Sequence, residues 1–310
     1  IADMHTFITN GKTVTIFSCT ESESPIIYLN TFSGEGQEVF ETVQATGCLP
    51  FTLVTISYLD WNHDMVPWDG PSALKNAGLK GGADDYLRLL TEEIIPTAEK
   101  GIAGVPCWRG IAGYSLAGLF ALYAIYQTDL FSHVGSMSGS LWYPGMKEYI
   151  FSHEPKRRPD CIYFSLGNKE SKTRNPVLRS VRQNTEEIQA FYQVKGINTV
   201  FQLNPGNHYD HAVERTAAGL CWLLTGELGP PPPGCILCIG VLKIDTPDSK
   251  NLLLLASAEV QYPKPEHEKE PSEQATAVIP RLVKKGSLTT CLTTDSAGAL
   301  GSSGIKSVKE

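Results

Sequence analysis

The chain has few of the features that would tie it to a nucleic acid or a membrane. Of its 310 residues, 26 are Lys or Arg and 33 are Asp or Glu, which gives a net charge of -7. Phosphate binding depends on clustered basic side chains, and the one short basic run is Lys156-Arg157-Arg158. No apolar run reaches the roughly 18 residues that a membrane span needs, and residues 1–10 lack the basic start and apolar stretch of a secretory signal. We therefore expect neither a nucleic-acid partner nor a membrane anchor.

The cysteines and histidines do not form a recognisable metal-binding pattern. Eight cysteines are scattered along the chain, several of them in apolar stretches where a thiol behaves as a small hydrophobe. This distribution favours reduced thiols and a cytoplasmic location. Cys235-x-x-Cys238 lacks a second pair, and His208, Asp210 and His211 lack further ligands at metal-binding spacing. We expect no metal ion.

Short β-rich runs alternate with longer helical patterns from Thr13 to about Leu224. This alternation predicts an α/β fold with a mainly parallel sheet that helices cover on both faces. The predicted strands are Val14–Ser18, Ile26–Asn30, Thr52–Ser57, Trp108–Ala112, His133–Met137, Cys161–Leu166 and Thr199–Leu203. The predicted helices are Glu38–Thr46, Asp84–Lys100 (bent or ended by Pro96), Leu116–Gln127, Val177–Val194 and His211–Leu224. Loops after the strands should gather along one sheet edge, where open α/β folds bind ligands.

The character of the sequence changes after Glu227. Pro230–Pro233 cannot continue a helix and is expected to be extended and semi-rigid. Two apolar runs follow, Cys235–Ile244 and Leu252–Tyr262, between charged and Pro-containing stretches. We predict one domain over residues 1–229 and a Pro-initiated extension over residues 230–310, which is either a small β-rich appendage or a partly disordered tail.

The segment Gly113-Tyr114-Ser115-Leu116-Ala117-Gly118 lies between a predicted strand and a predicted helix. A serine at such a sharp strand-to-helix turn, flanked by small residues, is typical of a nucleophile elbow, which lifts the hydroxyl clear of the sheet. The usual pattern would have glycine at Ala117, so the methyl group of this residue must be accommodated. The segment predicts that Ser115 is the nucleophile of a covalent acyl transfer.

A serine nucleophile needs a base within hydrogen-bond reach, and the base usually needs an orienting carboxylate. At such elbows the acid follows the serine in the chain and the histidine comes last. His208 has that place, in a turn-rich stretch after the last predicted strand. Glu170 follows the strand Cys161–Leu166 and is the candidate acid. Two alternatives stay open: Glu170 is a solvated loop charge, or the enzyme uses a Ser-His dyad without an acid.

Two backbone amides are expected to bind the negatively charged oxygen that forms during acyl transfer. One belongs to Leu116, directly after the nucleophile, and the other to Phe32 or Ser33, on the loop after the strand Ile26–Asn30. Aromatic residues on loops at the same sheet edge are predicted to line a substrate pocket. They are Trp61, Trp68, Trp142 and Tyr143, although Trp142 could instead pack beneath the elbow.

Over residues 10–226 the chain resembles the esterase family of α/β-hydrolases that includes enterochelin-type siderophore esterases and esterase-D-like enzymes. The resemblance rests on four blocks besides the elbow: Gly81-Gly82-Ala83 through Glu93-Ile94-Ile95-Pro96, Asp64–Trp68, Ser138-Gly139-Ser140-Leu141-Trp142 and Gly206-Asn207-His208. It implies an α/β-hydrolase fold with Ser115 as nucleophile, His208 as base and a carboxylate near Glu170. The chain departs from the family at Ala117, and at Asn30-Thr31-Phe32, where relatives often carry Leu-Asp-Gly.

Together these observations favour a serine carboxylic-ester hydrolase that acts on a small-molecule ester and needs no organic cofactor. The sequence leaves the ester open among siderophore lactones, aryl or feruloyl esters and short acyl esters. Two other functions stay possible for the same scaffold: an acyltransferase, in which an alcohol replaces water, and a binding protein that has lost turnover.

Overall fold

The computed structural model of the chain describes residues 3–70 and 78–228, together with short strands at residues 236–238, 242–243, 253–254, 289–291 and 306–308. The predicted extension, residues 230–310, therefore lies mostly outside the described residues. Its boundary at residue 229 stays a prediction.

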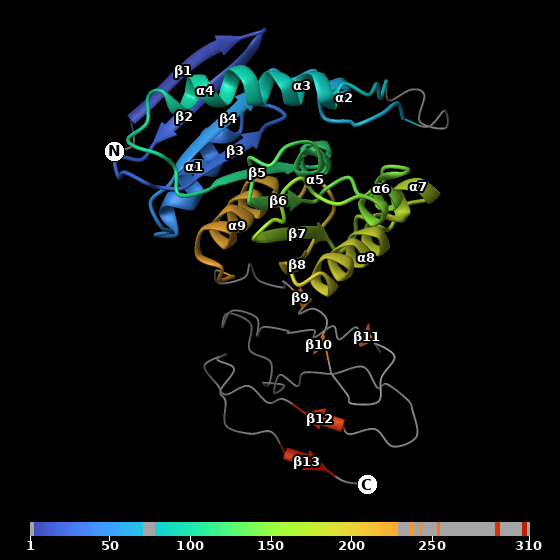
Figure 1. Cartoon of the computed structure of the whole chain (residues 1–310). Coiled ribbons are helices and arrows are strands. Elements are labelled where there is room, and N and C mark those ends of the chain that lie inside the picture. The colour runs from blue at the N-terminus through green and yellow to red at the C-terminus, as the bar shows by residue number, and fades with distance from the viewer. Residues whose placement is uncertain are drawn as a thin grey trace, which may run out of the picture.

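A nine-stranded sheet forms the centre of the chain, in the order β1-β2-β4-β3-β5-β6-β7-β8-β9 (Figure 1). The strands are β1 Asp3–Thr9, β2 Lys12–Ser18, β3 Ile26–Asn30, β4 Thr52–Ser57, β5 Arg109–Tyr114, β6 His133–Met137, β7 Cys161–Gly167, β8 Asn198–Asn204 and β9 Ile236–Cys238. Strands β3 to β8 pair in parallel, whereas β1, β2 and β9 pair antiparallel to their neighbours. All seven residues of β7 are buried, as expected for a central parallel strand with both faces covered.

Helices cover both faces of this sheet. They are α1 Gly36–Ala45, α2 Trp61–Asp64, α3 Ala83–Leu89, α4 Ile95–Glu99, α5 Leu116–Gln127, α6 Met146–Ser152, α7 Pro176–Arg179, α8 Val181–Val194 and α9 Ala212–Thr225. Helices α1 and α9 pack with one face of the sheet around Val39, Leu220 and their neighbours. Helices α3, α5 and α8 contribute Tyr86, Phe120 and Ile188 to a larger core on the other face. The predicted mainly parallel sheet between two helical layers is confirmed.

The predicted helix Asp84–Lys100 is present as one helical run, and Pro96 does not end it. A π-helical turn, η2 Leu90–Ile94, joins α3 to α4, and Pro96 lies in the first turn of α4. Proline is tolerated there because its missing N–H is not needed by the first turn of a helix, and a wider π turn before it shifts the hydrogen-bond register.

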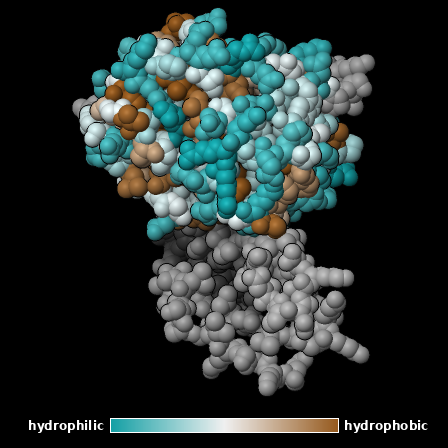
Figure 2. Space-filling model, in the orientation of Figure 1, coloured by the Kyte–Doolittle hydropathy of each residue, from teal (hydrophilic) through white to brown (hydrophobic). Residues whose placement is uncertain are grey.

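Several elements were not predicted from the sequence. Strand β1 pairs along its full length with β2, and α6 lies between β6 and β7. Strand β9 lies beyond residue 229 and pairs with the outer edge of β8, from Phe201 to Leu203. In Figure 2, hydrophobic residues on the visible described face form separate small groups among hydrophilic ones. Within the described ranges, no helix combines the length and apolar character that crossing a bilayer requires.

Candidate active site

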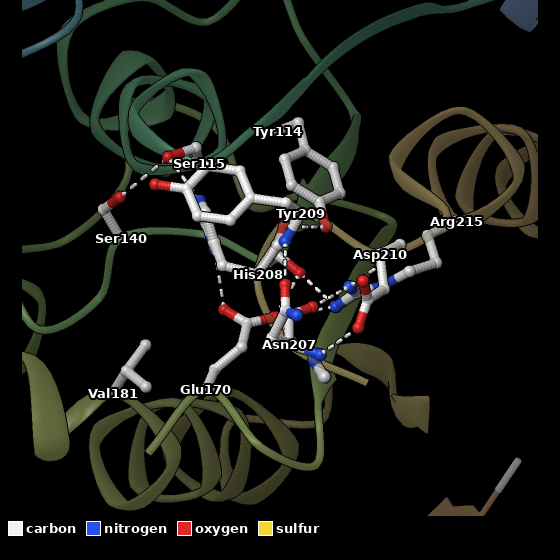
Figure 3. Close-up of polar contacts among 12 residues, drawn as sticks. Tyr114, Ser115, Ser140, Glu170, Val181, Asn207, His208, Tyr209, Asp210 and Arg215 are labelled. Carbon is white, nitrogen blue, oxygen red and sulfur yellow. Dashed lines mark hydrogen bonds and ion pairs between the residues drawn. The ribbon is translucent and has the colours of Figure 1, made fainter. Parts of the chain in front are cut away.

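Ser115 occupies a strained turn between β5 and α5. Its backbone has φ 59° and ψ -123°, a conformation that costs free energy for any residue with a side chain. Hydrogen bonds to both the backbone amide and the backbone carbonyl of Ser115 hold this turn. The Ser115 amide donates to the Met137 carbonyl at 3.1 Å, and its own carbonyl accepts from the amides of Gly118 and Ser140, both at 3.0 Å. The sharp strand-to-helix turn predicted at Ser115 is therefore present, and the Ser115 hydroxyl is directed toward His208 (Figure 3).

Ala117 fits into the elbow because Gly113 has no side chain. A Cβ added to Gly113 would lie 2.3 Å from the Cβ of Ala117 and 2.7 Å from its carbonyl oxygen. Ala117 is fully buried at this position. The methyl group that distinguishes this elbow from the usual sequence thus takes up the space beside Gly113.

His208 lies between Ser115 and Glu170, in the loop between β8 and α9. Its Nε2 is 2.9 Å from Ser115 Oγ, and its Nδ1 is 2.8 Å from Glu170 Oε2. An ionised Glu170 accepts from Nδ1–H, which leaves Nε2 to accept the serine proton. The Tyr114 hydroxyl donates to the His208 carbonyl at 2.8 Å and holds the loop against β5. Among the described residues, no group of three or more His, Cys, Asp or Glu side chains could hold a metal ion.

Glu170 lies in the loop after β7, and its side chain is 5% exposed. While Oε2 faces His208, Oε1 accepts from the Gly167 amide at 2.6 Å, from Ser138 Oγ at 2.7 Å and from Arg215 Nη2 at 2.7 Å. Burial alone would raise the pKa of Glu170, but the bonds and charges of His208, Gly167 and Arg215 together lower this pKa to about 2. The carboxylate is therefore ionised at neutral pH and fixed in direction.

The two backbone amides expected to bind an oxyanion differ in their hydrogen bonding. Leu116 is the first residue of α5, where helix amides have no acceptor within the helix. The amides of Phe32 and Ser33 instead donate to the carboxylate of Glu35, at 3.1 and 2.8 Å. The Phe32 amide, expected to be open to substrate, is thus occupied, because a glutamate three residues along the same loop folds back onto it.

The structure corrects one of the predicted pocket residues, Tyr143. Tyr143 is 1% exposed and donates from its hydroxyl to the Trp68 carbonyl at 2.6 Å. The Trp68 indole donates to the Pro144 carbonyl at 2.9 Å, and its ring packs against Tyr143. Tyr143 is therefore part of the core between the α2–α3 and β6–α6 segments and not a pocket wall. Trp68 is partly buried and packs against that core, and its predicted place in the pocket stays a prediction. Trp142 is half-buried and packs against the same core.

Different aromatic side chains are exposed beside the elbow. Tyr209 is 86% exposed, and its ring lies 5.3 Å from the His208 ring, edge to face. Phe32 is 69% exposed and packs edge to face on Trp61 at 5.2 Å. The sequence signals that could have identified them as site residues are the place of Tyr209 directly after His208 and the place of Phe32 on the loop beside the elbow.

Three polar residues around the site were not predicted from the sequence. Ser140 Oγ lies 3.4 Å from Ser115 Oγ, and Ser138 Oγ donates to Glu170. Arg215, in the first turn of α9, contacts both Glu170 and the loop of His208 (Figure 3). The two serines belong to a sequence block that carried the family resemblance, whereas nothing near Arg215 in the sequence indicates its role.

Three comparisons relate this chain to known proteins. The family model described as "Putative esterase" matches residues 29–214, well over half of the chain. A curated relative, the uncharacterized protein YbbA of Bacillus subtilis (strain 168), is 27% identical over 188 residues, which cover 58% of this chain and 75% of the relative.

Solved structures share the fold at low sequence identity. An IroE-like serine hydrolase from Shewanella oneidensis has a TM-score of 0.58 at 16% identity, over 72% of this chain and 80% of its own. The siderophore hydrolase EstA from Aspergillus nidulans has a TM-score of 0.53 at 18% identity, over 73% of this chain and 94% of its own. These solved structures share the α/β-hydrolase fold of the chain. The family match identifies the chain as an esterase, a member of the family that the model describes as "Putative esterase".

Proposed function

We propose that the chain is a serine carboxylic-ester hydrolase that works through an acyl-enzyme on Ser115. The observation that carries this proposal is the continuous chain of contacts from Ser115 Oγ to His208 Nε2 at 2.9 Å and from His208 Nδ1 to Glu170 Oε2 at 2.8 Å. A hydroxyl, an imidazole and a buried carboxylate in this order form the arrangement that activates a serine for attack on a carbonyl.

In the first half-reaction His208 Nε2 takes the Ser115 proton while Oγ bonds to the ester carbonyl carbon. The tetrahedral intermediate collapses, the bond to the alcohol oxygen breaks, and His208 returns the proton to the departing alcohol. In the second half-reaction His208 takes a proton from water, whose oxygen attacks the acyl-enzyme. Collapse then releases the carboxylic acid and returns the proton to Ser115 Oγ. Glu170 stays ionised and stabilises the imidazolium in both halves.

The oxyanion in this scheme is stabilised by backbone amides. The Leu116 amide stands at the N-terminus of α5, where the helix dipole also favours negative charge. Phe32 supplies the second amide once the developing oxyanion displaces the Glu35 carboxylate. The register supports this assignment, because Asn30 in β3 pairs with Gly113 in β5, so the Phe32 loop continues beside the elbow.

The substrate in this proposal is a small-molecule ester whose acyl or alcohol part carries a ring. The exposed rings of Phe32 and Tyr209 beside the elbow support this choice. Siderophore lactones and aryl or feruloyl esters fit it better than short acyl esters, and one structural relative is named a siderophore hydrolase. The cytoplasmic location expected from the scattered cysteines stays a prediction.

Hydrolysis is favoured over acyl transfer to an alcohol by the openness of the site. The His208 side chain is 29% exposed and the neighbouring Tyr209 is 86% exposed, so water can reach the imidazole that must activate it. An acyltransferase would gain from excluding water at this stage.

A panel of p-nitrophenyl and aryl esters, assayed with the full chain and with Ser115→Ala, tests the proposal. We expect turnover of at least one ester, with a loss on the order of 10⁴-fold or more in the variant, because it removes only the nucleophilic oxygen. Circular dichroism of both proteins checks that the fold is kept. Ordinary turnover by Ser115→Ala, or no turnover of any ester by the native chain, would contradict it.

A further inference from the structure

Arg215 is among the largest fully buried side chains of the described residues, and it lies behind His208 and Glu170. It is 2% exposed, although arginine is almost never fully buried without a partner. It comes from the first turn of α9, whereas Glu170 comes from the loop after β7. Burial of a guanidinium is costly unless its contacts are good, so the contacts that hold Arg215 require an explanation.

One part of the guanidinium faces the carboxylate. Arg215 Nη2 is 2.7 Å from Glu170 Oε1, the oxygen that does not face His208, and it also hydrogen-bonds Ser138 Oγ. Ser138 in turn donates to the same Oε1 at 2.7 Å. The two oxygens of Glu170 are therefore divided, with Oε2 reserved for the imidazole.

The other part of the guanidinium holds the loop that carries His208. Arg215 Nη1 donates to the carbonyls of Asn207 at 3.0 Å and Asp210 at 3.1 Å, which flank the histidine on both sides. The guanidinium carbon also lies 5.5 Å from the centre of the Tyr114 ring, whose hydroxyl donates to the His208 carbonyl. A single rigid, planar group thus contacts both Glu170 and the loop that carries its partner His208.

We propose that Arg215 is a positioning residue, which fixes Glu170 and the His208 loop relative to each other and offsets part of the carboxylate's charge beside the imidazole. The inference rests on the proposed function, since it concerns the same His208 base. A structural role alone would predict that loss of Arg215 lowers stability. The positioning role also predicts a change in the rate of the chemical step and in its pH dependence.

The direction of the pH effect follows from the charges around the imidazole. The His208 ring contacts Glu170 from the β7 loop, Ser115 from the elbow, Tyr114 from β5 and Tyr209 from its own loop. Two charged groups, Arg215 from α9 and Asp210 from the same loop, bond the backbone of the neighbouring Asn207. Between pH 5 and 8, Glu170 is negative and Arg215 positive. Removal of the positive charge stabilises the protonated imidazole, so His208 should lose its proton at higher pH.

Arg215→Gln and Arg215→Lys, measured beside the native chain, test the proposal. Arg215→Gln should lower kcat about tenfold to a hundredfold with little change in KM, because a misplaced base slows the chemical step. The rising limb of its kcat/KM profile should move to higher pH by about half a unit or more. Arg215→Lys keeps the positive charge but loses the planar guanidinium with its several N–H donors. The pH dependence of its kcat/KM should therefore match that of the native chain, while its kcat should lie between those of Arg215→Gln and the native chain.

Two matched variants separate positioning from general damage. Ser138→Ala removes the other side-chain donor to Glu170 Oε1 without a change of charge, so it should lower kcat without moving the limb. Arg182→Gln removes an exposed arginine that pairs with Glu186 on α8, and it should leave both quantities unchanged. Rates are expressed per active site, counted by titration with a fluorophosphonate, so that a misfolded fraction does not count as lost kcat.

The outcomes distinguish this inference from the proposed function. A native chain without ester turnover overturns both. The positioning role alone is overturned if the native chain hydrolyses an ester and a folded Arg215→Gln variant keeps both the native kcat and the native pH dependence of kcat/KM. If Arg215→Gln does not fold, Arg215→Lys is the test variant. A full native kcat in Arg215→Lys would contradict the claim that the planar guanidinium positions Glu170 and the His208 loop.

Discussion

The Cβ of Ala117 occupies the space that a side chain at Gly113 would need, because a Cβ added to Gly113 would lie 2.3 Å from it. Gly113→Ala should therefore force the elbow open. We expect a loss of about 1 to 3 kcal/mol in the free energy of unfolding, as for other overpacked cores. The kcat should fall at least about tenfold, because the Ser115 hydroxyl moves relative to His208. Urea unfolding and ester assays measure both effects.

Ala117→Gly is the matched control for this prediction. It restores the usual elbow sequence and should keep native kcat, at a cost of about 1 kcal/mol for glycine in a helix. The double variant should stay impaired, because the added Cβ at Gly113 would still lie 2.7 Å from the residue 117 carbonyl oxygen. Native activity in Gly113→Ala would show that the elbow is not packed as described.

Glu170→Gln decides between a triad and a dyad. If Glu170 orients His208, the variant should lose about 10² to 10⁴-fold in kcat, because a neutral amide can favour the wrong imidazole tautomer. Glu186→Gln, an exposed glutamate on α8, is the matched control and should keep native kcat. A loss of less than about tenfold in a folded Glu170→Gln variant would favour a Ser-His dyad.

The same carboxylate should make the fold sensitive to acid. The pKa of Glu170 is lowered from 4.5 to about 2 in the folded chain. Because the pKa of Glu170 is lower in the folded chain than in the unfolded chain, its ionisation stabilises the fold, by on the order of 3 kcal/mol. This stabilisation is fully present above pH 4.5, the unfolded pKa, and is lost as the pH falls from about 4.5 toward 2. The difference in unfolding free energy between the native chain and Glu170→Gln, measured in urea, should therefore shrink between pH 6 and pH 3. A constant difference across that range would speak against an ionised, bonded Glu170.

The three residues of the site could be predicted because each follows a strand of the sheet. Ser115 directly follows β5, Glu170 lies three residues after β7 and His208 four residues after β8, and the carboxyl ends of parallel strands share one edge. The strands themselves are short apolar runs with clear borders. The predicted bounds of β3, β4 and β6 match the structure residue by residue.

What the sequence could not indicate is which side chains meet across the fold. Arg215 follows Glu214 at the start of a helix and resembles a solvated charge, yet it is buried against a loop 45 residues away. Trp68 and Tyr143 lie on loops near the elbow, and their direction depends on packing between segments 75 residues apart. Strand β1 has a mostly exposed pattern, so it lacks the apolar alternation that predicts a strand.

Glu35 provides a test of the second oxyanion donor. If the oxyanion must displace the Glu35 carboxylate from the Phe32 amide, a weaker acceptor should release that amide more easily. Glu35→Gln should then raise kcat/KM by about threefold to tenfold, since a hydrogen bond to a neutral oxygen is roughly half as strong as one to a carboxylate. Glu38→Gln, on the exposed face of α1, is the matched control. Unchanged kcat/KM in Glu35→Gln would mean that Phe32 does not act as a donor.

The most direct test of the account is the identity of the residue that becomes covalently modified. The native chain is mixed with a fluorophosphonate, and in a second sample with a slowly hydrolysed aryl ester, and both are analysed by intact mass and peptide mapping. We predict one adduct per chain, on Ser115, with complete loss of ester turnover after phosphonylation and no adduct in Ser115→Ala. An adduct on another residue, or full turnover by a chain phosphonylated at Ser115, would contradict the assignment of Ser115 as the nucleophile.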